Sequence, residues 1–236
     1  MTSSKAIDIP EHSIYSTRYY QDLNSLFQFE LKSWIGRSFF TRQPPITSQQ
    51  NLLHLGCGQH KLKDWINADF FNLHFWNWRN SPHKADWMVD LRYPLPCKDS
   101  VWDGVLSEHT LEHLYPIQGL QLLRELHRTM KPGSWLRISV PDLAKYVSFY
   151  QKQPVSDRFM ASWDNGCEAI RNLTQNYRHL SVWDAELLTR FLTEAGFCNI
   201  QQVTWREGTD YRLLQDIPER QWESLYMEAQ KSLTRH

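Results

Sequence analysis

An apolar run, Leu52–Leu55, leads directly into the turn Gly56-Cys57-Gly58, and a second apolar run ends at Asp69. This is the order in which a βαβ unit presents a glycine turn and then an acid at the carboxyl end of its second strand. Glycines let the backbone approach a ligand without a Cβ clash, and a carboxylate can accept two hydrogen bonds from a ribose diol. The two features together therefore predict a nucleoside site at one edge of a parallel sheet.

Strand and helix signals alternate around and after this turn. Strands are expected at residues 52–55, 65–68, 87–89, 102–106, 135–140, 197–205 and 222–228, and helices at residues 119–130 and 185–195. The first of these helices is expected to stop at Lys131-Pro132-Gly133, because proline and glycine do not continue a helix. The alternation predicts an α/β fold, Rossmann-like and doubly wound, with a mostly parallel seven-stranded sheet and helices on both faces.

Two segments stand apart from this alternation. Residues 1–48 are expected to form an N-terminal helical extension, with a helix over Gln21–Trp34, and residues 49–236 to form the main domain. Within that domain, residues 144–183 are rich in aromatic and polar side chains and contain no clean strand. An insertion after a strand's carboxyl end lies over the ligand crevice of an open sheet, so this segment is expected to face the substrate. Packed surface helices are the alternative interpretation.

Composition limits the partners that the chain is expected to have. Lys plus Arg equals Asp plus Glu at 26 each, so net charge gives no reason to expect nucleic acid or an anionic membrane. The four cysteines are widely spaced without a CxxC pair, which is typical of reduced thiols. The first residues contain no apolar signal region, and no apolar run approaches the length of a membrane span. A cytoplasmic protein is expected, and the sequence fixes no oligomeric state.

A second acid supports the nucleoside site. Asp90 follows the third expected strand and opens Asp90-Leu91-Arg92-Tyr93-Pro94. An acid at this position can accept a hydrogen bond from an adenine amine while Leu91 and Pro94 cover the base. Either aspartate by itself is equally typical of a turn, but both together, in register with the strands, favour a binding site.

Four segments together, LHLGCG, WINADF, DLRYPLPCKDSVWDGVLSEHTLEHL and LLRELHRTMKPGSWLRISVPDL, resemble the class I S-adenosylmethionine-dependent methyltransferases. The group with an LGCG…W-N-x-D opening is the most similar. The resemblance covers about residues 52–143, and AELLTRFLTEAGFCNI and ESLYMEAQK extend it toward the C-terminus. It implies S-adenosyl-L-methionine as the cofactor and an activated methyl group as the species transferred.

The resemblance also implies roles by position. Gly56 and Gly58 would line the methionine part of the cofactor, and Leu55 and Cys57 of the same turn are also expected to bind the cofactor. Asp69 would bind the ribose hydroxyls, and Asp90 and the Leu91 backbone would hold the adenine. Ser107 would lie near the sulfonium. His54 stands where many relatives have an acid, and Lys61 takes the place of a third glycine.

The segment Glu108–His113 allows several interpretations. His109-x-x-Glu112-His113 matches the H-x-x-E-H pattern of inverted zinc peptidases. However, the segment directly follows an expected strand, and no third ligand is evident in the sequence. His109 is close to the expected point of methyl transfer and could act as a general base. Glu112 and His113 are expected to tie the loop to the sheet. Some quinone-pathway methyltransferases hold a divalent metal with acids at this loop, but His109 replaces one of those acids, so no metal is expected.

The function predicted from sequence is transfer of a methyl group from S-adenosylmethionine to an oxygen or nitrogen atom of a small-molecule or glycan-like acceptor. A non-catalytic nucleoside-binding module on the same fold is one alternative, since fold does not fix function. An NAD(P)-linked oxidoreductase is the other, and it is disfavoured because the third glycine of a pyrophosphate-binding turn is missing.

Overall fold

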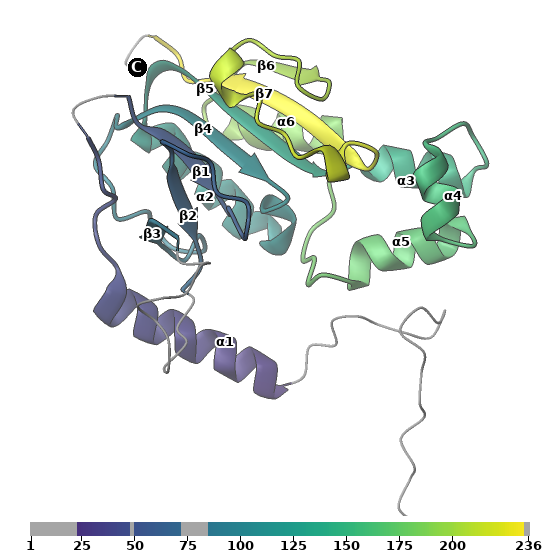
Figure 1. The fold of residues 1–236 in the computed structure, drawn as a ribbon, viewed down its shortest axis with the longest axis horizontal. Coiled ribbons are helices and arrows are strands. Elements are labelled where there is room, and N and C mark those ends of the chain that lie inside the picture. Colours follow the sequence, from purple (N-terminus) through teal and green to yellow (C-terminus); the bar gives the residue numbers. More distant parts are fainter. Residues whose placement is uncertain (1–22, 48–49, 72–84, 234–236) are drawn as a thin grey trace, which may run out of the picture.

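The computed structural model describes residues 23–47, 50–71 and 85–233, so Gln21 and Asp22 of the expected first helix lie outside the described part. Its centre is a seven-stranded sheet in the order β3-β2-β1-β4-β5-β7-β6 (Figure 1). The strands are β1 (Leu52–Leu55), β2 (Ile66–Asp69), β3 (Trp87–Met88), β4 (Trp102–Glu108), β5 (Met130–Pro141), β6 (Cys198–Val203) and β7 (Ser224–Gln230). β1 to β5 pair in parallel, and β7 is antiparallel to both β5 and β6. The predicted α/β class and mostly parallel seven-stranded sheet are confirmed.

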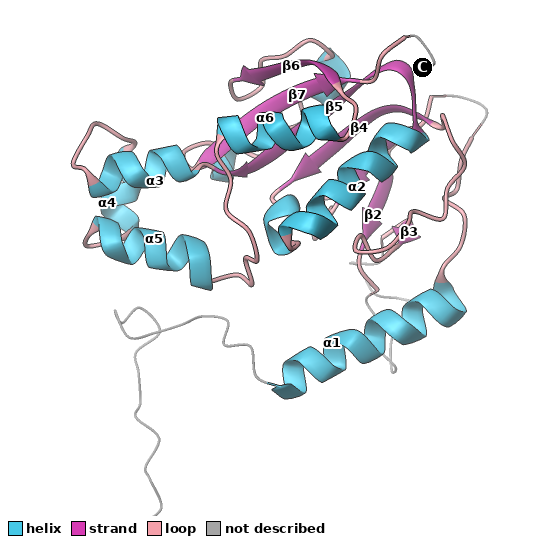
Figure 2. Cartoon of the chain, turned by 180° about the vertical axis from the view of Figure 1, so that it is seen from behind, coloured by secondary structure: helices cyan, strands magenta, loops and turns pink. Residues whose placement is uncertain are grey.

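One face of the sheet is covered by α2 (Pro116–Thr129) and α6 (Ala185–Glu194), which lie side by side (Figure 2). Their apolar stripes enter the main core, where Leu123 and Leu188 are fully buried. Asp184 begins α6 by accepting a 2.8 Å hydrogen bond from the backbone N–H of Leu187. Among the described helices, none has the length and apolar character needed to cross a membrane.

The opposite face at β5 and β7 is covered by residues 204–221, which include the short 3₁₀ turns Tyr211–Leu213 and Pro218–Arg220. Its core is ionic. The fully buried Arg137 donates to Asp216 at 2.7 Å and to Glu228 at 3.0 Å. Because an unpaired charge in this position would be strongly unfavourable, the three side chains fix the segment to the sheet as a unit.

Residues 143–175 form three short helices beyond one end of the sheet (Figure 1). They are α3 (Leu143–Tyr150), α4 (Asp157–Ser162) and α5 (Gly166–Gln175). Aromatic side chains of this segment pack against one another in a separate small core around Tyr146 and Phe159, which are both buried. Much of the aromatic content of residues 144–183 is therefore structural.

β5 begins five residues earlier than expected and runs through Pro132 instead of starting at Trp135. Met130 pairs with Trp102, and the next pair joins Trp135 to Gly104, so the intervening residues bulge out of the ladder. A bulge tolerates proline, which has no N–H to donate to a neighbouring strand. The expectation that Lys131-Pro132-Gly133 is a connection outside the strand is therefore wrong, although α2 does end just before it, at Thr129.

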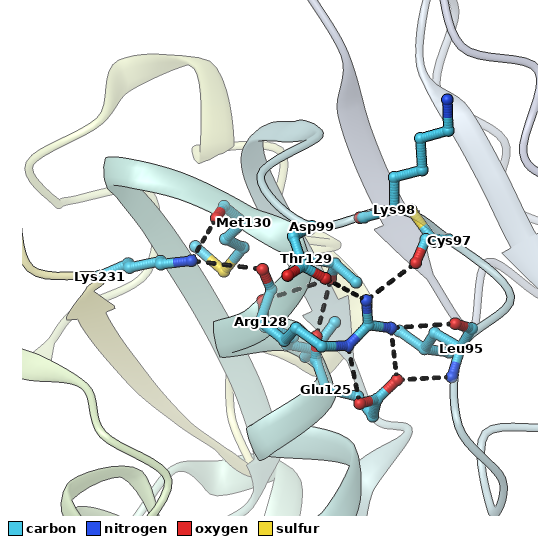
Figure 3. Close-up of polar contacts among 10 residues, drawn as sticks. Leu95, Cys97, Lys98, Asp99, Glu125, Arg128, Thr129, Met130 and Lys231 are labelled. Atoms are coloured by element: carbon cyan, nitrogen blue, oxygen red, sulfur yellow. Dashed lines mark hydrogen bonds and ion pairs between the residues drawn. The ribbon is translucent and has the colours of Figure 1, made fainter. Parts of the chain in front are cut away.

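Arg128 fastens the loop after β3 to the end of α2 (Figure 3). Its guanidinium donates to the backbone oxygens of Leu95 at 3.1 Å and Cys97 at 2.9 Å, and to the carboxylates of Glu125 at 2.7 Å and Asp99 at 2.6 Å. The carboxylate of Glu125 in turn accepts a 2.8 Å hydrogen bond from the backbone N–H of Leu95. The network holds in place the loop that carries Asp90 and Leu91 at its start.

α1 (Leu23–Ile35) continues into a single π-helical turn, Gly36–Phe40. It lies across the β3 side of the molecule rather than apart from the sheet (Figure 1). Trp87 of β3 donates a 2.9 Å hydrogen bond from its indole N–H to the backbone oxygen of Arg42, and this contact holds the chain after α1.

Candidate functional site

A cavity of about 540 Å³ opens where β1, β2, β3 and β4 end. Several of the residues predicted from sequence line it: Gly56, Gly58, Asp69, Asp90, Leu91 and His109. Ser25, Leu26, Phe29 and Glu30 of α1 form another wall, and His113, Tyr115, Tyr177 and Arg178 lie at the end near α2 and the segment after α5. The topology thus brings the glycine turn, both aspartates and the fourth strand's tip to one site, as open α/β sheets generally do.

The glycine turn is held by the second strand and by Thr110. The backbone N–H groups of Gly56 and Cys57 both donate to the carbonyl oxygen of Ala68, at 2.8 and 3.1 Å. Gly56 and Gly58 have φ values of +69° and +52°, which favour glycine. A Cβ atom on Gly56 would lie 2.0 Å from Oγ1 of Thr110. Both the backbone conformation and the space therefore require glycine at position 56.

Asp69 fixes the far end of the same turn. One carboxylate oxygen accepts a 2.5 Å hydrogen bond from the backbone N–H of Gly58, and the other accepts one of 2.6 Å from Phe70. The Cys57 thiol also lies 3.9 Å from the first of these oxygens. The side chain still lines the cavity, and the oxygen bound by Phe70 has a further lone pair. The carboxylate is thus held rigidly with acceptor capacity toward a ligand.

Asp90 is almost completely buried and already has donors on both oxygens. Ser33 of α1 donates to it at 2.6 Å, and Arg92 donates through its backbone N–H and its guanidinium. Burial would raise the pKa of Asp90, but Arg92 and Ser33 outweigh it and hold that pKa below its usual range. Arg92 also forms an ion pair with Glu30, so the Asp90 carboxylate anchors α1 at the cavity.

Aromatic rings line the side of the cavity formed by α1. Phe29 stacks on Phe70 with ring centroids 4.5 Å apart and an interplanar angle of 19°. The guanidinium of Arg92 lies 4.6 Å from the centroid of the Phe29 ring. This wall lies beside both Asp69 and Asp90, and it is apolar enough to cover a planar base.

Four residues near the turn do not line the cavity within the described part of the chain: His54, Leu55, Cys57 and Ser107. All four are nearly or fully buried. Burial lowers the pKa of His54 to about 4 and raises the pKa of the Cys57 thiol to about 12, so both groups are neutral. Leu55, Cys57 and Ser107 were expected to contact the cofactor, but they are buried and do not line this cavity.

His109 follows β4 at φ +45°, lines the cavity and contacts Ser224, the first residue of β7. Its Nε2 is 2.6 Å from Oγ of Ser224, and that hydroxyl lies 2.7 Å from the carbonyl oxygen of Arg220. The two ring nitrogens of His109 thus have different polar partners, a hydroxyl at Nε2 and a carboxylate at Nδ1. Nδ1 lies 3.2 Å from Oε1 of Glu112.

Glu112 is 1% exposed and has three histidines around it. Burial would raise the pKa of Glu112, but His109, His113 and His179 together lower it, so the carboxylate is ionised. A second cavity of about 380 Å³ is lined by these residues with Tyr177, Arg178 and Arg220. It shares His109, His113, Tyr177 and Arg178 with the larger cavity.

The contributions of α1 and of the segment after α5 to the cavity could not be predicted from the sequence. Phe29 and Glu30 look like ordinary residues of an amphipathic helix, and nothing in their spacing shows that the helix packs on Asp90. The role of Thr110 could not be predicted either, because its side chain acts by filling the space next to Gly56. His179 lies 66 residues after His113 in the chain and carries no local motif, so only the fold brings the two rings to a centroid separation of 5.1 Å.

A comparison with known protein families also points to a methyltransferase. The family model described as a methyltransferase domain matches residues 28–202, most of the 236-residue chain. Its match begins within α1, which fits the part that this helix has in the cavity. A comparison with curated proteins finds no match.

Two solved structures show the same fold. One is a SAM-dependent methyltransferase from Archaeoglobus fulgidus, with 18% sequence identity, 89% of this chain and 100% of the other covered, and a TM-score of 0.50. Another is a SAM-dependent methyltransferase from Thermotoga maritima described as a possible histamine N-methyltransferase, with 15% identity, 88% and 90% coverage, and a TM-score of 0.50. With the family match over residues 28–202, the chain belongs to the methyltransferase-domain family and is a class I S-adenosylmethionine-dependent methyltransferase.

Proposed function

We propose that this methyltransferase transfers the methyl group to an oxygen or nitrogen atom of a small-molecule or glycan-like acceptor. The observation that carries the proposal is that one cavity joins the cofactor turn at Gly56 to a polar and aromatic end at His113, Tyr177 and Arg178. Its volume of about 540 Å³ lies in the range of small-ligand sites. Exposed tyrosine rings such as Tyr115 and Tyr177 offer flat apolar surfaces on which a sugar or another ring can stack.

The cofactor is proposed to lie along the strand ends. Its ribose diol would be held by Asp69, and its adenine would lie by Leu91 against the Phe29 and Phe70 wall. The methionine part would lie over Gly56 and Gly58, whose lack of side chains leaves the backbone open to it. Asp90 then acts by holding Arg92 and α1, because it is almost completely buried and each of its oxygens already has at least two donors.

The chain's part in the reaction is to position the two reactants and to take up a proton. S-adenosylmethionine supplies an activated methyl group, so alignment of the acceptor atom with the methyl carbon and exclusion of water account for much of the rate. His109, which lines the cavity, would accept the acceptor's proton. The Glu112 carboxylate, 3.2 Å from Nδ1, would stabilise the imidazolium that forms.

The test is a methyl-transfer screen with S-adenosylmethionine labelled in its methyl group, against sugars, sugar acids, amines and phenols. Transfer to a hydroxyl or amine acceptor that is abolished in His109→Ala, while binding of S-adenosylhomocysteine persists in that variant, supports the proposal. Transfer to carbon, or to a protein or nucleic acid in preference to every small acceptor, would contradict it.

A further inference from the structure

Glu112, His113 and His179 form a cluster at the smaller cavity. Each offers one ligand atom, and the three atoms lie within 4.8 Å of one another. Glu112 and His113 come from the 3₁₀ turn Leu111–His113, and His179 comes from the segment after α5. Two imidazoles and a carboxylate are a ligand set that zinc and similar divalent ions bind in proteins.

One oxygen of the buried Glu112 carboxylate has no donor. The side chain is 1% exposed, and its Oε1 lies 3.2 Å from Nδ1 of His109 as an ion pair. No described residue donates a hydrogen bond to Oε2. A buried carboxylate oxygen without a partner is unfavourable unless a donor or a cation satisfies it. A bound metal ion would supply the missing charge.

His179 is oriented as metal-binding histidines are. Its Nδ1 donates a 2.7 Å hydrogen bond to the carbonyl oxygen of Leu173, which leaves the lone pair on Nε2. Such a second hydrogen bond to a carbonyl commonly fixes the tautomer and ring direction of a metal ligand. The backbone N–H groups of Leu180 and Ser181 donate to the carbonyl oxygen of Glu112, at 2.7 and 3.1 Å. The segment that carries His179 is therefore fastened to the turn that carries the other two ligands.

Arg220 also lines this cavity, and its charge is already balanced. Its guanidinium forms a 2.7 Å ion pair with Glu223. The arginine is thus paired with a different carboxylate, and it acts on Glu112 only through its charge, without a hydrogen bond.

We propose that Glu112, His113 and His179 bind one divalent transition-metal ion of the zinc type. The sequence predicted no metal at this loop. The proposal differs because His179, the third ligand, comes from a distant segment that no sequence motif connects to Glu112 and His113. Three protein ligands leave a coordination position open on the cavity that these residues line. That cavity is continuous in its lining with the proposed acceptor end, so an oxygen or nitrogen atom of a small ligand can fill the position.

The experiment is a metal titration of the purified full chain after treatment with a chelator, without any cofactor. Zn²⁺ affinity is measured by competition with a chromophoric chelator, and Co²⁺ binding by its visible d–d absorption. His179→Ala and Glu112→Gln are compared with His60→Ala and Glu186→Gln, which change an exposed histidine and an exposed glutamate outside the cluster. These controls are needed because the chain has 10 histidines.

One ion per chain is expected, with an affinity on the order of 100-fold weaker in His179→Ala and in Glu112→Gln and unchanged in both controls. Absence of saturable one-to-one binding, or wild-type affinity in His179→Ala, would overturn the proposal. Circular dichroism and the urea midpoint establish that each variant folds. If His179→Ala does not fold, the metal affinities of Glu112→Gln and His113→Ala replace it: weaker binding supports the proposal, and wild-type affinity overturns it. The result is independent of methyl transfer, because neither cofactor nor acceptor is present.

Discussion

The hydroxyl of Ser33 in α1 donates a 2.6 Å hydrogen bond to the buried carboxylate of Asp90, 57 residues later in the chain. This contact joins an N-terminal helix to the end of the third strand. Arg92 strengthens the joint, since it binds Asp90 on one side and Glu30 of α1 on the other. The helix is consequently a wall of the cofactor cavity.

Replacing Ser33 with alanine tests whether α1 is part of the cofactor site. The change leaves one oxygen of the buried Asp90 without its α1 donor, and we expect S-adenosylhomocysteine to bind about tenfold more weakly, or about 1.4 kcal/mol. Calorimetric titration measures the effect. Ser148→Ala, which removes a hydroxyl from α3 far from the cavity, is the control and should bind like the wild type. Equal affinities in the two variants would show that α1 does not contribute.

Thr110 and Gly56 should be coupled. Gly56→Ala is expected to abolish cofactor binding, because its Cβ would lie 2.0 Å from Oγ1 of Thr110 and because φ is +69°. In Gly56→Ala/Thr110→Ala the hydroxyl contact is gone and part of the affinity should return, while the backbone strain persists. A double-mutant cycle on S-adenosylhomocysteine affinity measures the coupling. Additive effects of the two substitutions would contradict the steric account.

His54 should make the fold sensitive to mild acid. Burial lowers its folded-state pKa to about 4, whereas the unfolded chain titrates near 6.5, so the unfolded state binds more protons below about pH 6.5. Stability is therefore unaffected above that pH and is lost as pH falls from 6.5 toward 4, by roughly 2 kcal/mol at pH 5. Urea unfolding at pH 7.5 and pH 5 should show this loss in the wild type and a smaller loss in His54→Gln.

The control for His54 is His60→Gln, which changes an exposed histidine of the following loop. It should retain most of the acid sensitivity of the wild type, because burial lowers the pKa of His54 more than the nearby His60 does. If His54→Gln loses as much stability between pH 7.5 and pH 5 as the wild type does, another group is responsible.

His109 should govern the reaction rate rather than cofactor binding. Once an acceptor is known, His109→Ala is expected to lower kcat by about 100-fold or more through loss of the general base. Ser224→Ala removes the hydroxyl that lies 2.6 Å from Nε2 of His109, so a smaller fall of about tenfold is expected, with an altered pH profile of kcat. Unchanged kcat in His109→Ala would mean that the acceptor reacts without a base from this residue.

The sheet could be predicted from sequence because each central strand is a short apolar run that ends in a turn residue or an acid. Leu52–Leu55 and Ile66–Asp69 lie within a residue of the positions expected. β5 was misjudged at its start because the proline rule assumes regular pairing, whereas the ladder between β4 and β5 bulges at Pro132. Periodicity describes one strand at a time and cannot show such a register shift.

The residues of the site also fall into a predictable and an unpredictable group. Gly56, Gly58, Asp69 and Leu91 were predictable because they follow consecutive strands, whose carboxyl ends must meet at one edge. Partners that come from distant segments were not predictable. Ser33 reaches Asp90 from α1, and His179 reaches Glu112 from beyond α5. Such contacts depend on how whole elements pack, and no local spacing encodes them.

The most direct test of the cofactor site is calorimetric titration of the full chain with S-adenosylhomocysteine, for the wild type, Asp69→Asn and the exposed control Asp164→Asn. One molecule should bind per chain, with wild-type affinity in Asp164→Asn. In Asp69→Asn, loss of the charge-assisted hydrogen bonds to the ribose should weaken binding by about 2–3 kcal/mol, or roughly 30- to 150-fold. Wild-type affinity in a folded Asp69→Asn variant, or binding of NAD and not of S-adenosylhomocysteine by the wild type, would contradict the account.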